Sequence, residues 1–396
     1  YVMQVHCPGA GEAGAADVTV VDHVKLFRNL PELRFEGRLH EQILPAIRRL
    51  GGTVAWTDVF VVHSGYDHSP EGQEQKKQRD LRLLHLELQE QPEHPFTLFN
   101  LGMTYADLGE YEQAVEFLQR SLALSGEGDS HLRKVYALLV YCSAQLGRAD
   151  EAGEICAAGL RRFPEDTELH FRRGLLLQQR GRLPEAVAAY QRVLERRGER
   201  YFSSLDRGLH GFKTRQNLAV TYAELGDLAR AEEQWRRVVA EVPQYRPGWQ
   251  GLGDVLLAQA RYAEIAQLAE RLRGDAQLRA AGSILQGRLA IVRGELAQAR
   301  AVLGGAVRET PEDAELWEHW CRFLFEHGEA EETARALQEL LHRVPEDAAA
   351  LHNLGAIYCR QGRRRQAAEM LRQSLRLRPN APHTRALLQT VADPAD

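Results

Sequence analysis

The chain has 396 residues, a formal net charge of −5 and 44% hydrophobic residues. This length exceeds one ordinary hydrophobic core and predicts at least two structural units. The mild charge excludes the strongly basic composition typical of nucleic-acid binders, and no apolar run approaches the ~20 residues that span a bilayer.

The first 90 residues mix strand and helix patterns and predict a small α/β segment. β-Branched and apolar runs predict strands over 18–21, 24–27 and 54–62, the first two being interrupted by Asp22 and His23. Apolar residues at helical spacing predict helices over 37–50 and 71–91. These elements are too few for a complete α/β domain. Because the chain begins with Tyr1 inside an apolar run, we expect it to be a piece of a longer protein.

Three stretches of this segment, 24–29, 35–41 and 61–66, carry a family resemblance. The most specific one reads Phe35-x-Gly37-x-Leu39-His40-Glu41. It resembles the carboxyl-terminal part of a bacterial family 2 glycosyltransferase with the GT-A fold. The resemblance implies that His40 lies near the donor diphosphate and its divalent cation, Mn²⁺ or Mg²⁺. It also implies that Glu41 is a catalytic acid that orients the acceptor or the metal-bound water.

From the residues alone, His40 and Glu41 have a second interpretation, in which they only cap and charge a helix that starts near Gly37. The chain also departs from the glycosyltransferase pattern, because it has no nucleotide-binding half and no Asp-x-Asp motif. We expect that half to lie upstream of Tyr1. The chain alone is therefore expected to be inactive and to hold no cofactor, and a nucleotide sugar is expected to bind only when that half is present.

A 34-residue repeat runs from residue 95 to 381, with one clear copy in Leu354-Gly355, Tyr358, Gly362, Ala367 and Pro379. Each copy predicts two antiparallel helices, and a glycine ends the first helix in a left-handed conformation. Repeats begin near Pro95, Arg133, Thr167, Phe212, Arg246, Ala280, Ala314 and Ala348. The predicted helix-ending glycines are Gly109, Gly147, Gly181, Gly226, Gly294 and Gly362.

This pattern resembles the tetratricopeptide repeat (TPR). The predicted fold class is mainly α, a TPR α-solenoid of about eight repeats preceded by an incomplete α/β segment. The predicted parts are the glycosyltransferase segment (1–70), a linking helix (71–94), the TPR array (95–381) and a capping helix with its tail (382–396). Small residues are expected where paired helices touch. They are Gly102, Gly174, Gly253, Gly287 and Gly355 in first helices, and Ala114, Ala152, Ala186, Ala231, Ala299 and Ala367 in second helices.

The resemblance implies a protein or peptide partner in the groove lined by the first helices. Asparagine at the sixth repeat position can hydrogen-bond a peptide backbone, and three repeats carry it: Asn100, Asn217 and Asn353. An insertion at 201–211 separates the third and fourth repeats and predicts a loop, often found on the binding face of a solenoid. Its candidate contact residues are Phe202, Asp206, Arg207 and His210; the alternative is a neutral surface loop.

The five cysteines form no CxxC pair and predict free thiols in a reducing cytoplasm, with Cys156 and Cys321 buried. The predicted function is the acceptor-side and interaction portion of a bacterial glycosyltransferase that takes a nucleotide-sugar donor. The alternative is a non-enzymatic TPR scaffold for protein–protein interaction. Neither interpretation includes a nucleic-acid partner.

Overall fold

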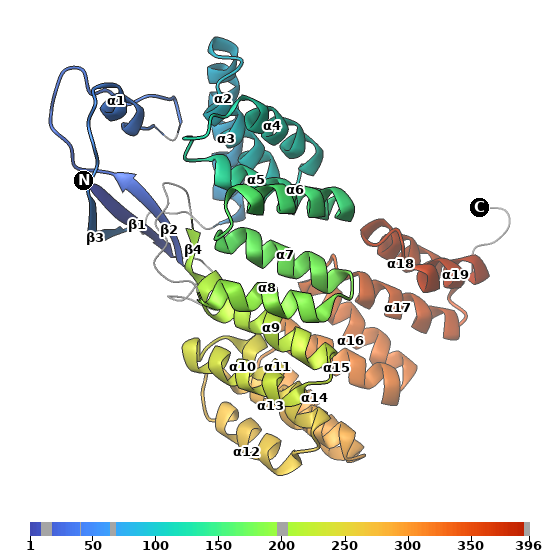
Figure 1. Ribbon diagram of the computed structural model, residues 1–396. Helices are drawn as coiled ribbons and strands as arrows, with labels where there is room; N and C mark the ends of the chain where they lie inside the picture. The colour runs from blue at the N-terminus through green and yellow to red at the C-terminus, as the bar shows by residue number, and fades with distance from the viewer. Residues whose placement is uncertain (9–17, 40, 64–68, 196–204, 392–396) are drawn as a thin grey trace. The chain divides into compact units, whose positions relative to one another are not determined.

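A computed structural model describes residues 1–8, 18–39, 41–63, 69–195 and 205–391. The chain divides into two compact units, Tyr1–Leu252 and Gly253–Asp396. The first unit holds all four strands of the described residues and the first repeats, and the second unit consists of helices (Figure 1).

A four-stranded sheet opens the first unit, with the order β3-β1-β2-β4. Strand β1 (Val2–Pro8) is antiparallel to β2 (Val18–Val24) and parallel to β3 (Trp56–Val62). Strand β4 (Leu205–Asp206) comes from far along the chain and pairs antiparallel with β2. A small core joins the sheet to the short helix α1 (Leu44–Arg49). It contains Val2, Val24, Ile43, Leu44, Ala46 and Ile47.

Several boundaries in this segment differ from the sequence prediction. The two strands predicted over 18–27 are the single strand β2, which runs through Asp22 and ends at Val24, and strand β1 was not predicted. The helix predicted over 37–50 is only α1, because Pro45 lies in its first turn, where the missing N–H costs nothing. Residues before it form an isolated antiparallel bridge between Glu36 and Gln42.

Helix α2 (Pro70–Glu90) agrees with the helix predicted over 71–91 to within one residue at each end, and it ends four residues before the end of the predicted linking segment 71–94. The hydroxyl of Ser69 caps it by accepting from the Gly72 N–H at 3.1 Å. Eight helices follow in the first unit as four antiparallel pairs. They are α3 (Pro95–Asp107), α4 (Tyr111–Leu124), α5 (Leu132–Gln145), α6 (Ala149–Arg162), α7 (Thr167–Gln179), α8 (Leu183–Glu195), α9 (Phe212–Glu224) and α10 (Leu228–Glu241).

Helix α11 (Arg246–Ala258) crosses the boundary at which the chain divides, and the second unit continues the same pattern. Its helices are α12 (Tyr262–Arg273), α13 (Arg279–Val292), α14 (Leu296–Glu309), α15 (Ala314–His327), α16 (Ala330–Arg343), α17 (Ala348–Arg360), α18 (Arg364–Leu377) and α19 (Pro382–Val391). The sixteen helices predicted for residues 95–381 are therefore confirmed as α3 to α18, and α19 is the expected capping helix.

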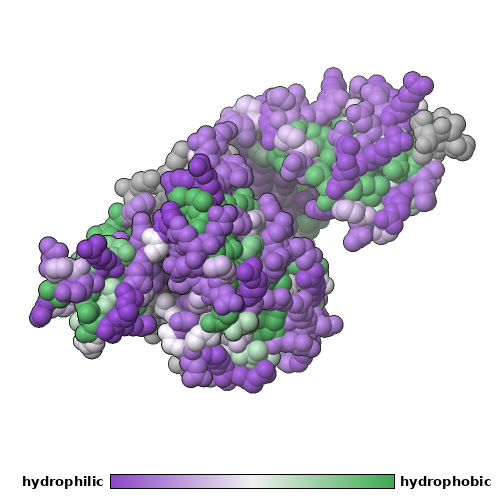
Figure 2. Space-filling model, turned by 90° about the horizontal axis from the view of Figure 1, so that it is seen from above, coloured by the Kyte–Doolittle hydropathy of each residue, from purple (hydrophilic) through white to green (hydrophobic). Residues whose placement is uncertain are grey.

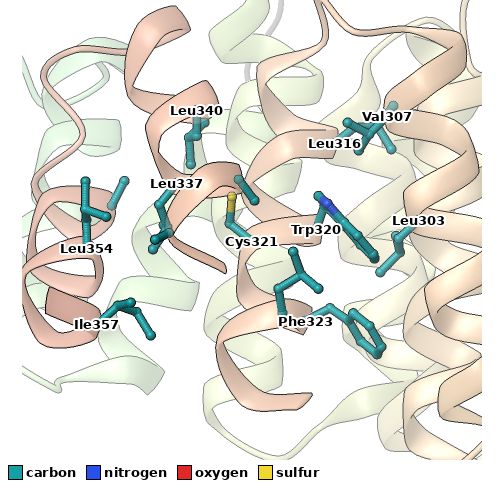
Figure 3. Close-up of a cluster of buried hydrophobic side chains, with 14 of the residues drawn as sticks. Leu303, Val307, Leu316, Trp320, Cys321, Phe323, Leu337, Leu340, Leu354 and Ile357 are labelled. Carbon is teal, nitrogen blue, oxygen red and sulfur yellow. The ribbon is translucent and has the colours of Figure 1, made fainter. Parts of the chain in front are cut away.

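The core of the second unit is built from side chains of consecutive helices. Figure 3 shows Leu303, Trp320, Cys321, Leu337 and Leu354 in this cluster. Trp320 stacks on Phe323 with ring centroids 5.6 Å apart. Hydrophilic residues dominate the face of the molecule in Figure 2, with hydrophobic residues scattered among them. The helices thus bury their apolar sides against neighbouring helices, as a repeat solenoid requires.

Glycines occupy the two repeat positions for which they were predicted. Those that end first helices have φ between 70° and 79°, the left-handed region that favours glycine: Gly109, Gly147, Gly181, Gly226, Gly294 and Gly362. At the helix contacts, a Cβ atom on Gly102 would lie 2.5 Å from Leu118, and one on Gly174 would lie 2.4 Å from Tyr190. The close approach of paired helices therefore depends on these glycines. The predicted contact alanines Ala114, Ala152, Ala186, Ala231, Ala299 and Ala367 are fully buried.

Candidate functional site

The loop that carries the glycosyltransferase-like motif is tied to the first repeat by a buried carboxylate. Glu87 on α2 is 8% exposed. One of its oxygens accepts from the Arg38 backbone N–H at 3.0 Å, and the other accepts from the Thr97 hydroxyl at 3.0 Å. Gly37 precedes this contact with φ of 97°. These two hydrogen bonds hold the motif loop against α2 and α3. They also offset the free-energy cost of burying the Glu87 carboxylate.

Of the two residues predicted for chemistry, His40 lies outside the described residues. Glu41 is exposed and lines a cavity of about 60 Å³ together with Asp22, His23 and Lys25. Among the residues that the structure describes, no three His, Cys, Asp or Glu side chains are grouped to hold a metal ion. The described surroundings of Glu41 therefore do not fit a cation site by themselves, and the catalytic and metal roles stay predictions. The capping alternative is wrong in its geometry, because α1 begins at Leu44 rather than near Gly37.

The insertion between the third and fourth repeats contributes to the N-terminal sheet. Its residues Leu205 and Asp206 form β4, which pairs with Val20 and Thr19 of β2. Asp206 then caps the short 3₁₀ helix Arg207–His210 by accepting from the Gly208 N–H at 2.8 Å, and it pairs with Lys213 at 2.7 Å. The expectation of a simple loop is wrong for these residues.

Arg207 reinforces this junction, because its guanidinium donates to the Gln4 amide oxygen on β1 at 3.0 Å. Its Nη2 also lies 3.3 Å from Nε2 of His6, whose ring stacks on Phe60. His210 belongs to the 3₁₀ helix, and Phe202 lies outside the described residues. A partner contact by any of these side chains stays a prediction.

A cluster of charged side chains joins the first helices of the second and third repeats. We call Arg133, Lys134, Asp166, Glu168 and Arg172 the groove cluster. Arg133 donates to Asp166 at 2.8 Å, with both side chains almost fully buried. Lys134 on α5 and Arg172 on α7 both donate to Glu168, at 2.8 Å and 3.0 Å. Asp166 also caps α7 by accepting from the Leu169 N–H at 2.7 Å.

The electrostatics of the groove cluster follow from this arrangement. Burial raises the pKa of Glu168, but Lys134, Arg172 and Arg133 outweigh it and hold that pKa at about 2. The guanidinium of Arg172 also lies 5.0 Å from the ring centroid of Tyr141, a cation–π distance. Three cations of the cluster surround two carboxylates, and the nearby Asp107 carboxylate also interacts electrostatically with Lys134. Lys134 and Arg172, which are 15% and 18% exposed, are the two cations of the cluster that reach solvent in part.

The sequence interpretation missed the groove cluster, although a signal was present. Lys134 and Glu168 occupy the same position of consecutive repeats, 34 residues apart, so stacked first helices bring opposite charges together. Of the predicted asparagines, Asn100 is only 2% exposed, whereas Asn217 and Asn353 are partly exposed. The Asn217 amide donates to the Lys213 carbonyl of its own helix at 2.8 Å. Their role in peptide binding stays a prediction.

Stacked antiparallel helix pairs with this glycine register define an α-solenoid repeat protein. Tetratricopeptide repeat models match residues 95–127, 143–200, 213–240, 280–304 and 324–390. These matches together span more than half of the chain, which therefore belongs to the tetratricopeptide repeat family.

Solved structures with a similar chain path include a tetratricopeptide repeat protein from Parabacteroides merdae ATCC 43184. It is 14% identical, with a TM-score of 0.46, over 76% of this chain and 99% of that one. The type IV pilus biogenesis factor PilW is 17% identical, with a TM-score of 0.44, over 57% and 97% of the two chains. TM-scores below 0.5 say nothing about a shared function.

Two curated relatives are glycosyltransferases. The SPbeta prophage-derived glycosyltransferase SunS of Bacillus subtilis (strain 168) is 26% identical over 127 residues, 32% of this chain and 30% of that protein. Glycosyltransferase SunS of Bacillus phage SPbeta matches to the same extent. The chain thus spans about 30% of the length of the relatives that it matches. Among the described helices, none is long and apolar enough to cross a membrane.

Proposed function

We propose that this chain is the acceptor-side and partner-recruiting portion of a glycosyltransferase. In this proposal the enzyme transfers a sugar from a nucleotide-sugar donor, and the first helices of the repeats hold a protein or peptide partner. The likeness to SunS supports the transferase part, and the family of the repeats supports the recruiting part. The competing proposal is a non-enzymatic scaffold in which the α/β segment is vestigial.

One structural observation favours the glycosyltransferase proposal over the scaffold. The repeats contain an inserted strand, β4, that extends the N-terminal sheet from β2, about 180 residues away in sequence. If the α/β segment were vestigial, we would not expect an insertion in the repeat array to supply a strand to the sheet of that segment. The pairing of β4 with β2 and the bonds of Glu87 to the motif loop therefore favour an α/β segment that works together with the repeats.

The groove cluster is the partner contact that we propose for the first-helix surface. Its two partly exposed cations, Lys134 and Arg172, already donate to Glu168. In this proposal an acidic side chain or a chain-terminal carboxylate of the partner competes with Glu168 for them. A guanidinium can bind a carboxylate through two parallel hydrogen bonds, which gives it directional specificity. In the proposed enzyme, this contact would hold a partner on the same unit as the α/β segment.

The decisive experiment uses the complete product of the gene. Purified protein is incubated with a panel of nucleotide sugars in the presence of Mn²⁺ or Mg²⁺, and release of the nucleoside diphosphate is measured. We expect turnover, and we expect His40→Ala to lower it by about tenfold or more with little change in thermal stability. The exposed His342 provides the matched control, because His342→Ala leaves turnover unchanged. A complete protein that consumes no nucleotide sugar would favour the scaffold, and full turnover by His40→Ala would remove His40 from the site.

A further inference from the structure

A larger cavity, separate from the groove cluster, lies between the motif loop and the first repeat. Its volume is about 520 Å³, which falls within the range of small-molecule pockets. One wall comes from the motif loop and α1, including Gln42 and Arg48. The opposite wall comes from the end of α2, the start of α3 and the turn before α5, including Gln91, His94 and Ser130.

The carboxylates that line this cavity are already engaged by the protein. Glu36 pairs with Arg49, and Glu87 accepts from the Arg38 N–H and the Thr97 hydroxyl. Asp129 accepts from the Gly126 N–H at 2.9 Å. Their charges are therefore directed at fixed partners. These partners offset part of the carboxylate charge, and the guanidinium groups of Arg48 and Arg49 line the same cavity.

Uncharged polar groups remain available at the same walls. Within the part of the chain that the structure describes, the side chains of Gln42, Gln91 and Ser130 make no hydrogen bond. His94 contacts Thr97 through Nδ1, which lies 3.3 Å from the backbone nitrogen and 2.9 Å from the hydroxyl oxygen. Burial lowers the pKa of the neighbouring His131 to about 4, which keeps that ring uncharged at neutral pH. Two amides and a hydroxyl each both donate and accept hydrogen bonds.

Apolar surface completes the lining through Pro45, Pro95 and Phe96. An aromatic ring and two prolines beside amides that donate and accept suit a ring that has C–H faces and hydroxyl edges. We propose that this cavity binds a carbohydrate, whose hydroxyls meet Gln42, Gln91 and Ser130 while a C–H face packs on Phe96. Its role as the sugar subsite of the acceptor rests on the proposed glycosyltransferase function, whereas the binding itself does not.

The test begins with the 396-residue chain on an array of mono- and oligosaccharides, followed by calorimetric titration of the strongest sugar. We expect the double variant Gln42→Ala/Gln91→Ala to weaken binding by about tenfold, since each lost amide removes a hydrogen bond to the sugar. Gln179→Ala is the matched control, because Gln179 is also an exposed glutamine at the end of a helix and lies outside the cavity. Gln91→Ala alone, at an exposed position, should weaken binding in the same direction and covers the case in which the double variant misfolds.

Absence of binding to every sugar, or equal weakening by Gln179→Ala, would overturn the proposal. The proposal would also be overturned if a peptide bound the chain through Gln42 and Gln91 and no sugar bound. If sugar binding depends on Gln42 and Gln91 but the complete gene product consumes no nucleotide sugar, the cavity assignment stands and the glycosyltransferase function fails. If turnover is found and the glutamine variants bind sugar normally, the glycosyltransferase function stands and the cavity assignment fails.

Discussion

Ala260 takes the place of a helix-ending glycine in the turn between α11 and α12. Its φ is 55°, in the left-handed region, and it is the only such non-glycine residue among those described. The Ala260 N–H donates to the Leu257 carbonyl at 2.9 Å, and the Arg261 N–H donates to the Leu256 carbonyl at 3.0 Å. One repeat earlier, the Gly226 and Asp227 N–H groups make the equivalent bonds to the carbonyls of their own helix. The repeat turn is therefore kept at the cost of a strained alanine.

We predict that Ala260→Gly stabilises the protein by about 1 kcal/mol, because glycine adopts this conformation without the clash of a Cβ atom. The midpoint of urea unfolding should rise. Gly294→Ala is the matched reverse change, since its φ is 73° and no atom lies within 4 Å of the added Cβ, so only backbone strain is introduced. It should lower the midpoint by a similar amount. An unchanged midpoint in both variants would contradict the prediction.

Glu168 gives a prediction that depends on pH. Its folded pKa of about 2 lies below the ordinary value of 4.5, so its contribution to stability is present above pH ~4.5 and is lost as the pH falls toward 2. Glu168→Gln should cost about 3 kcal/mol at pH 7, because it leaves buried cations without their partner. Its free energy of unfolding should then fall less steeply than that of the wild type between pH 4.5 and 2.

The control for Glu168 is the exposed Glu112, whose side chain is 63% exposed and pairs with Arg148. Glu112→Gln should change stability by less than about 1 kcal/mol, as solvent-exposed ion pairs do. Equal effects of the two substitutions would mean that the groove cluster adds nothing beyond an ordinary surface pair. Denaturant unfolding of the three proteins at several pH values makes the comparison.

At the scale of elements, the junction between β4 and β2 can be tested through its cap. Asp206→Ala removes both the cap of the 3₁₀ helix and the ion pair with Lys213, a loss of about 1 kcal/mol. We predict faster amide hydrogen exchange in β2, while α13 to α18 keep their protection. Asp227→Ala is the control, since Asp227 caps α10 through the Arg230 N–H at 3.0 Å and contacts no strand. Unchanged hydrogen exchange in β2 would mean that the Asp206 cap in the insertion does not contribute to the stability of the sheet.

The same junction bears on the α/β segment by itself. We predict that residues 1–90 alone do not fold stably, because that fragment lacks β4 and the Thr97 hydroxyl that satisfies Glu87. Thermal unfolding followed by circular dichroism should show no cooperative transition for the fragment. A cooperative transition would show that the segment needs no support from the repeats.

For the whole molecule, the repeat array should be helical without the α/β segment. We predict a strongly helical circular dichroism spectrum for residues 92–396, since each repeat packs mainly on its neighbouring repeats and every helix from α3 to α19 is retained. A substantial β contribution would contradict this prediction. The full chain, measured in parallel, should differ only by the contribution of the small sheet, α1 and α2.

The sequence by itself determined the repeat array, because every repeat depends on local signals. Gly362 ends a helix through its own φ, Gly355 admits Leu371 at a fixed spacing, and Pro379 follows the end of α18. The periodicity also predicted that Cys156 and Cys321 are buried, and they are 2% and 3% exposed. Such features need only neighbours within about one repeat length, so a single sequence carries them.

Only the tertiary structure decided where the insertion goes and what the motif loop contacts. Strand β4 is two residues long and gains its hydrogen bonds from β2, which lies far away in sequence, so no local pattern marks it. The Glu87 carboxylate likewise bridges Arg38 and Thr97, and the cavity beside it draws its walls from four separate segments. Contacts between distant segments depend on how the chain packs, and periodicity within one element does not encode them.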